Sequence, residues 1–333
     1  MLPHRRGGAR VPIRRIPLAP TPSQPAGSSV LVNEYETSPS DCIEVKRVLA
    51  KASGFPPEIV DIIMDFAEYW VCSVSTIDCT GLQSGHHIIA SGRPDKENEM
   101  LIRTPPLGLT KWRPGNNELW RTKATPRPLQ EEYPQSQLLK DYASGPKDTL
   151  EHPCRKVVFD ITSHDQGFGG EAATRGTYNR SYTWFDAGLD RFDASNECPQ
   201  DCKERTEPQR ADHAAEMIPT CAIRPVWPPL NEAATDYDHA LHSPPDHVIQ
   251  RNKVAVKEWQ DHHVEWSRAD NIDPESTAGQ DLETVHGRGA ATGNGEFVRD
   301  LKVGDMVTVW GRARFGAWKN FVKTATVRVY WAV

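Results

Sequence analysis

The sequence predicts a mainly β protein whose C-terminal part is an antiparallel sandwich, preceded by a short helical segment and an N-terminal tail. Two runs near the end of the chain, residues 305–315 and 323–331, alternate apolar and polar side chains as half-buried strands do. Helical periodicity is strongest over residues 41–70. Short strands between long proline-containing loops favour a two-sheet sandwich over a parallel α/β fold.

Length and charge limit the function classes. The 333 residues allow one or two domains. With 39 basic and 45 acidic residues the net charge is −6, which argues against general nucleic-acid binding. No apolar run approaches the roughly 18 residues of a membrane span, and no secretory signal begins the chain. Seven cysteines cannot all pair, so we expect a reducing cytoplasmic or nuclear location.

Residues 1–40 are predicted to be a disordered, basic, proline-rich tail. Five arginines precede the first acidic residue, Glu34, as in a mitochondrial presequence. Six prolines between Pro3 and Pro25 would interrupt the amphipathic helix that such a presequence needs. A solvated tail is therefore the favoured interpretation.

Residues 41–72 are predicted to form two helices. Asp41, followed three residues later by an acid, resembles a capping box, and Gly54 is placed to end the first helix. Pro57 suits the first turn of the second helix. Apolar side chains then recur at helical spacing, with acids between them: Ile59, Ile62, Ile63, Phe66 and Trp70.

Residues 73–333 are predicted to form the sandwich. Beyond the two terminal runs, strands are expected at residues 73–78, 100–103, 157–162, 178–185 and within 254–266. A proline-rich stretch at 113–147 and a long charged insertion at 188–246 are expected to interrupt them.

The two terminal runs are predicted to be adjacent antiparallel strands joined by a turn near Gly316. One face of this pair is expected to be buried. Its core residues are predicted to be Val307, Val309, Val327 and Val329.

Residues 54–63, Gly-Phe-Pro-Pro-Glu-Ile-Val-Asp-Ile-Ile, resemble the first helix of an F-box, with Phe55 where leucine is usual. The resemblance implies docking on a Skp-type adaptor of a cullin ubiquitin ligase, with a second domain that receives a substrate. The alternative is an amphipathic helix packed on the sandwich. The implied partner-binding residues are Pro57, Glu58, Ile59, Ile62 and Phe66.

Residues 67–70 (Ala-Glu-Tyr-Trp) and 164–170 (His-Asp-Gln-Gly-Phe-Gly-Gly) look like uncharacterised fungal proteins that join an F-box-like segment to a jelly-roll sandwich. The turn at 301–305, Leu-Lys-Val-Gly-Asp, is similar to that of galactose-binding-like sandwiches. These resemblances imply a jelly-roll-like architecture and no particular activity.

A polar cluster between a strand end and a glycine run is the candidate ligand site, because loops on a rigid sheet often carry binding groups. Aromatic rings beside carboxylate, amide and guanidinium groups suit a glycan or a polar peptide. The alternative is that the tryptophans belong to the core and that the loop residues stabilise a turn. The predicted site comprises His164, Asp165, Gln166, Trp184, Asp186, Arg312 and Trp318.

No catalytic residue, metal site or cofactor is predicted. Residues 81–85 lack the spacing of a nucleophile elbow, and no Gly-Lys-Ser/Thr follows a glycine run. Four residues could together bind zinc: Cys198, Cys202, His213 and Cys221. The favoured interpretation is that these cysteines are surface residues that bind no metal.

The sequence thus predicts a non-catalytic recognition protein with a protein or glycan ligand and no nucleic-acid or membrane partner. One alternative is a plain structural sandwich. The other is a carbohydrate-active enzyme in which Asp186 pairs with Asp190 or Asp193 across a cleft.

Overall fold

The computed structural model describes residues 36–93, 96–111, 121–143, 151–195 and 220–333. Most of the predicted tail lies outside these residues, as do Cys198, Cys202 and His213 of the considered zinc set. Parts of the stretch at 113–147 and of the insertion at 188–246 also lie outside them.

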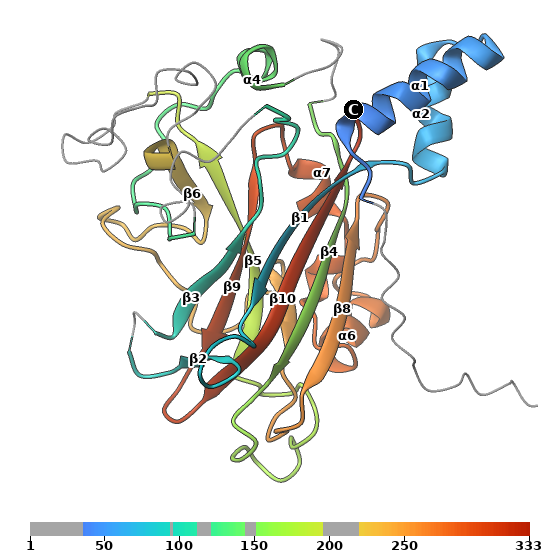
Figure 1. Ribbon diagram of the computed structural model, residues 1–333. Coiled ribbons are helices and arrows are strands. Elements are labelled where there is room, and N and C mark those ends of the chain that lie inside the picture. The colour runs from blue at the N-terminus through green and yellow to red at the C-terminus, as the bar shows by residue number, and fades with distance from the viewer. Residues whose placement is uncertain (1–35, 94–95, 112–120, 144–150, 196–219) are drawn as a thin grey trace, which may run out of the picture. The chain divides into compact units, whose positions relative to one another are not determined.

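Two five-stranded antiparallel sheets form the described protein, which confirms the predicted mainly β sandwich (Figure 1). Along the chain, most connections from β2 onward cross between the sheets, as in jelly-roll folds. The first sheet has the order β1 (Val71–Asp78), β10 (Lys319–Trp331), β4 (Cys154–His164) and β8 (Gln260–Ser267), with β2 (His87–Ala90) also paired to β10. The second has the order β3 (Asn98–Arg103), β9 (Met306–Ala313), β5 (Thr183–Phe192) and β6 (Ile223–Trp227), with β7 (Val248–Arg251) also paired to β5.

The main core lies between the sheets because alternate side chains of each strand face inward. Phe159 of β4 meets Trp266 of β8 edge to face, with ring centroids 5.1 Å apart. The predicted burial of the terminal valines is confirmed. Each of them is at most 3% exposed: Val307, Val309, Val327 and Val329.

The predicted pairing of the last two strands is wrong. β9 pairs with β3 and β5 in one sheet, whereas β10 pairs with β1, β2 and β4 in the other. The chain crosses between sheets around residues 314–318, where Phe315 and Ala317 have φ of 62° and 75°. The two runs therefore face each other across the core, because alternation specifies one core-facing side without specifying the lateral neighbour.

The predicted insertion contains regular strands. β5 continues to Phe192 and β6 occupies part of the same range, while residues 178–182 are irregular. Charged residues such as Asp190 made this stretch resemble a solvated loop. The Asp190 carboxylate is instead buried in an ion pair with Arg103 of β3, two strands away in the same sheet.

The N-terminal helices α1 (Pro39–Ser53) and α2 (Pro57–Phe66) project from one end of the sheets (Figure 1). The capping residue is Ser38, whose hydroxyl accepts from the Asp41 N–H while Asp41 accepts from the Ser38 N–H. Gly54, at φ 68°, ends α1 as predicted. The other helices in the described residues are α4 (Gln135–Tyr142), α6 (Thr277–Thr284) and α7 (Glu296–Asp300), with 3₁₀ turns η1 (Thr220–Ala222) and η2 (Ala290–Gly293).

Candidate functional site

The helical pair, α1 and α2, is attached to the sandwich through one side of α2. Val60 and Met64, one turn apart, are 2% and 6% exposed and belong to the main core. Cys42 of α1 is buried in the same core. The side of α2 that packs inward is thus formed by residues that the predicted apolar stripe did not include.

Four of the five residues of the predicted stripe instead form an exposed apolar face, whereas Trp70 is buried. Ile59 is 40% exposed, Ile62 50% and Phe66 88%, and Ile63 lies between them at 36%. Phe55, which precedes α2, is exposed as well. Exposed apolar side chains gathered on one face are typical of protein interaction sites. We call Ile59, Ile62, Ile63 and Phe66 the apolar face.

Ion pairs hold the helical pair in position. The Arg155 guanidinium donates to both carboxylate oxygens of Asp65, over 2.8 and 3.1 Å, and the Trp70 indole donates to the same carboxylate over 2.9 Å. Burial raises the pKa of Asp65, but the hydrogen bonds from Arg155 and Trp70 outweigh it and hold that pKa below its ordinary value. Lys46 of α1 pairs with Asp61 of α2 at 2.6 Å. The apolar face is therefore presented on a fixed support.

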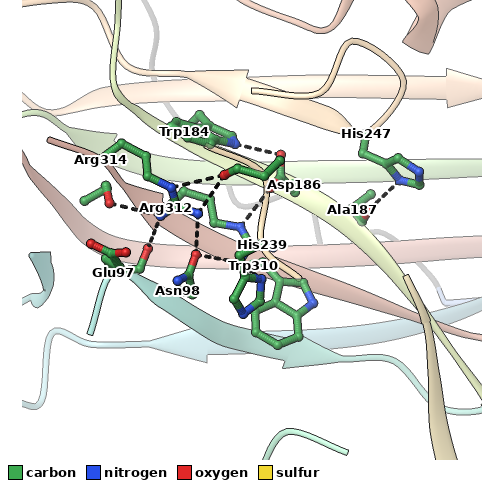
Figure 2. Close-up of polar contacts among 12 residues, drawn as sticks. Glu97, Asn98, Trp184, Asp186, Ala187, His239, His247, Trp310, Arg312 and Arg314 are labelled. Carbon is green, nitrogen blue, oxygen red and sulfur yellow. Dashed lines mark hydrogen bonds and ion pairs between the residues drawn. The ribbon is translucent and has the colours of Figure 1, made fainter. Parts of the chain in front are cut away.

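Three of the predicted ligand residues, Trp184, Asp186 and Arg312, meet in a buried network on the side of the second sheet that faces away from the main core. Figure 2 shows Arg312 beside Asp186, with Nε 2.8 Å from the Asp186 carboxylate. The Trp184 indole donates to the other oxygen of that carboxylate over 2.8 Å. Arg312 also donates to Asn98 Oδ1 over 3.0 Å. Trp184 and Arg312 are 1% and 2% exposed, so this network lies out of reach of a solvent-borne ligand.

The segment between β6 and β7, which covers this side of the second sheet, contributes His239 to the network. The Nδ1 of His239 accepts from Arg312 over 2.8 Å, and Ala240 O accepts from Arg314 over 2.9 and 3.1 Å. Burial, together with the positive charge of Arg312, lowers the pKa of His239 to about 2, so the ring is the neutral acceptor that this contact needs. Burial also raises the pKa of Asp186, against the effect of Arg312.

The carboxylates of the enzyme hypothesis serve the structure. Asp186 is paired with Arg312, and Asp190 is paired with Arg103 at 2.8 Å, with both of these side chains 1% exposed. Asp193 accepts from the backbone N–H groups of residues 130, 131 and 195. Each of the three carboxylates is thus held by an arginine or by backbone N–H groups, which argues against an acid and nucleophile pair.

His164 and Gln166 lie at the other outer side of the sandwich, beyond the first sheet. Ile161 and Ser163 of β4 are buried, so His164 points outward with Thr162. Its ring stacks on Phe321 at 4.7 Å and meets Trp259 edge to face at 4.3 Å. His86 contacts the same two rings at 5.3 and 5.8 Å. We call these four residues the aromatic cluster: His86, His164, Trp259 and Phe321.

Asp165 has a structural role. It is fully buried, and its carboxylate accepts from the backbone N–H groups of Gly167 over 2.7 Å, Ala255 over 2.6 Å and Val256 over 3.0 Å. Burial raises its pKa against these three hydrogen bonds. Asp165 thus joins two loops and does not face a ligand.

The structure therefore separates the predicted ligand site. Trp184, Asp186 and Arg312 are together but buried, whereas His164 is on the opposite outer side. Trp318 lies in the turn before β10, where its ring meets Tyr182 at 5.2 Å. Gln166 accepts from Lys319 N. The ligand site predicted from the sequence does not include Trp259 and Phe321. The signal that could have identified them is an aromatic residue at a position that alternation turns outward.

Metal-binding groups, membrane-spanning helices and similarity to known proteins were each considered for this chain. Within the described ranges, no group of three or more His, Cys, Asp or Glu side chains is arranged to hold a metal ion. None of the helices in the part of the chain that the structure describes is long and apolar enough to cross a membrane. Comparison of the chain with protein-family models, curated proteins and solved structures finds no match.

Proposed function

We propose that this chain is a non-catalytic recognition protein whose helical pair docks on a partner protein while the sandwich receives a ligand. The observation that carries the proposal is the exposed apolar face, presented on a helix whose opposite side is buried in the core. In keeping with the F-box resemblance, the partner is a Skp-type adaptor of a cullin ubiquitin ligase.

The physical case rests on area and on rigidity. Full burial of an exposed isoleucine or phenylalanine side chain contributes about 1.5–3 kcal/mol. Ile59, Ile62 and Phe66 still expose 40%, 50% and 88% of their surface, so covering all three provides enough for a specific contact. The Asp65–Arg155 and Lys46–Asp61 pairs fix the helical pair before binding. Little conformational entropy is then lost when a partner covers the apolar face.

The test measures binding of the full chain to a purified Skp-type adaptor by biolayer interferometry. Ile62→Asp is expected to abolish binding and to leave the melting temperature nearly unchanged, because Ile62 is half exposed. Lys51→Asp, which places the same acid on the exposed last turn of α1, is the matched control and keeps binding.

Two outcomes contradict docking. One is a wild-type chain that does not bind the adaptor at micromolar concentration. The other is a large drop in melting temperature for Ile62→Asp, which would make α2 a core helix on both of its sides.

A second candidate, glycan binding by the sandwich, is favoured by the aromatic cluster. Trp259 is 39% exposed between two imidazole rings, with the Lys323 ammonium 6.0 Å from its ring centre. Such a platform can stack on a sugar ring while the imidazoles bind its hydroxyls. Trp259→Ala is expected to remove any signal on a glycan array, and Trp318→Ala, outside the cluster, to retain it. Equal signals from both variants would exclude this surface.

A further inference from the structure

The edge strand β1 differs from the other outer strands of the sandwich. Natural edge strands are protected against pairing by shortness, charge, proline or a bulge. β2 and β7 have four residues each, β3 has a register shift between Met100 and Ile102, β6 contains Pro225, and β8 carries Asp261 and Glu265. β1 runs for eight residues in unbroken register with β10, and its one charge is the terminal Asp78.

The free edge of β1 presents backbone hydrogen-bonding groups. Cys79 N donates to Lys323 O toward β10, whereas Cys72 N donates away from β10, to Thr37 O over 3.1 Å. Alternation along an antiparallel strand therefore turns the N–H and C=O groups of Val74, Thr76 and Asp78 outward as well. Within the described residues, no backbone hydrogen bond reaches these outward groups.

A groove of about 760 Å³ lies beside this edge, between β1 and β3. Its apolar lining includes Ile77 of β1 and Leu101 and Ile102 of β3. Next to Cys79 the groove carries two carboxylates, those of exposed Asp78 and of Glu99, which is bonded to His87. Arg103 and Arg121 also line the groove.

We propose that β1 binds an extended peptide segment of a partner protein, which adds to the first sheet as an antiparallel strand. The Thr37–Cys72 contact shows that the edge already accepts backbone from another part of the chain at its first position. The added strand continues the pattern by pairing with Asp78, Thr76 and Val74. Main-chain hydrogen bonds supply affinity and alternate side chains supply selectivity.

The register specifies the side chains of the peptide. Residues opposite Ile77 and Ser75 point into the groove, where small β-branched apolar side chains fit beside Leu101. The residue opposite Cys79 points toward Glu99, so a basic side chain belongs there. The partner segment therefore begins with Lys or Arg and continues with alternating polar and β-branched apolar residues. This surface is separate from the apolar face, so the inference stands without adaptor docking.

The experiment uses the full chain and a fluorescein-labelled peptide, Lys-Thr-Val-Thr-Val-Thr-amide, read by fluorescence anisotropy. Saturable binding in the micromolar range is expected. Methylation of the backbone nitrogen of the fourth peptide residue, which pairs with Thr76, is expected to weaken binding at least tenfold. Methylation of the third, whose N–H points away from β1, is the matched control and is expected to change binding by less than threefold.

Two protein variants complete the test. Thr76→Pro removes an outward N–H that β10 does not use and is expected to weaken binding at least tenfold. Glu99→Gln is expected to weaken the lysine peptide several-fold and to leave a peptide with threonine in place of lysine unchanged. Equal binding of the two methylated peptides overturns the proposal even if Thr76→Pro does not fold. A concentration-dependent dimer in sedimentation that excludes the peptide also overturns it, because a second copy then occupies the edge.

Discussion

Arg312 and Asp186 form an ion pair with a 2.8 Å Nε–Oδ2 distance, and both side chains are only 2% exposed. Arg312 comes from β9 and Asp186 from the neighbouring β5. Asn98 and His239 accept further hydrogen bonds from the guanidinium, so Arg312 has several hydrogen-bond partners in its buried position. The pair joins β5 to β9, and the contact of Arg312 with His239 ties this side of the second sheet to the segment that covers it.

Breaking this pair is expected to destabilise the fold. Arg312→Met leaves the Asp186 carboxylate buried without its partner and should lower the free energy of unfolding by about 3–5 kcal/mol. Asp186→Leu alone should cost a similar amount. The double variant should cost less than the sum of the two by about 2 kcal/mol, because it removes both charges. Urea unfolding of the four proteins measures this coupling, and strict additivity would contradict it.

A charge in the main core provides a separate test of the sandwich. Val309, on β9, is fully buried, so Val309→Asp should lower the free energy of unfolding by about 3 kcal/mol or more. Lys319→Asp, at an exposed position at the start of β10, is the control and should stay within about 0.5 kcal/mol of the wild type. Thermal and urea unfolding report both. A mild effect at Val309 would be inconsistent with the core described here.

Acidification is expected to destabilise the protein through two histidines, the half-buried His239 and the buried His262. Burial lowers the pKa of His239 to about 2 and that of His262 to about 4. The unfolded chain, with an ordinary histidine pKa near 6.5, binds protons that the folded chain does not, so stability falls as pH drops below about 6.5. At pH 5 each histidine should remove about 2 kcal/mol.

Urea titrations between pH 8 and pH 5 measure this slope. His262→Leu should reduce this slope by the contribution of about one proton taken up on unfolding. The reason is that the Nε2 of His262 has no hydrogen-bond partner in the described part of the chain and that the ring lies among core residues. An unchanged slope in that variant would show that His262 is protonated in the folded state.

Asp165 and Trp259 should behave differently on substitution. Asp165→Ala leaves three half-buried backbone N–H groups without their acceptor and should lower the free energy of unfolding by about 3 kcal/mol. Trp259→Ala, at a partly exposed ring, should cost about 1 kcal/mol or less. Differential scanning calorimetry compares the two. A stable Asp165→Ala protein would return this carboxylate to the candidate ligand residues.

Much of the fold followed from local patterns. The strands near residues 73–78, 100–103 and 157–162 appear as β1, β3 and β4, because period-two alternation marks a half-buried strand wherever it pairs. Gly54 ended the first helix as predicted, since its left-handed φ of 68° favours glycine. β5 was placed only in part, because buried carboxylates within it look like surface charges until their arginine partners are known.

The candidate sites were harder to predict than the strands. The sequence singled out Ile59, Ile62 and Phe66, but it did not separate an exposed stripe from a buried one. The structure separates the two because Val60 and Met64 lie on the side of α2 that packs into the core. His164 was singled out too, yet its neighbours Trp259 and Phe321 come from the approach to β8 and from β10, far away along the chain.

The sequence by itself determined the class of fold, most of its strands and the core valines, because these depend on side-chain periodicity within a few residues. Only the tertiary structure decided that β9 and β10 face each other across the core instead of pairing side by side. It also decided that Asp165 and Arg312 are buried and that Ile62 is exposed. These outcomes depend on partners distant along the chain, and the free energy of burial is set by those partners and not by the residue alone.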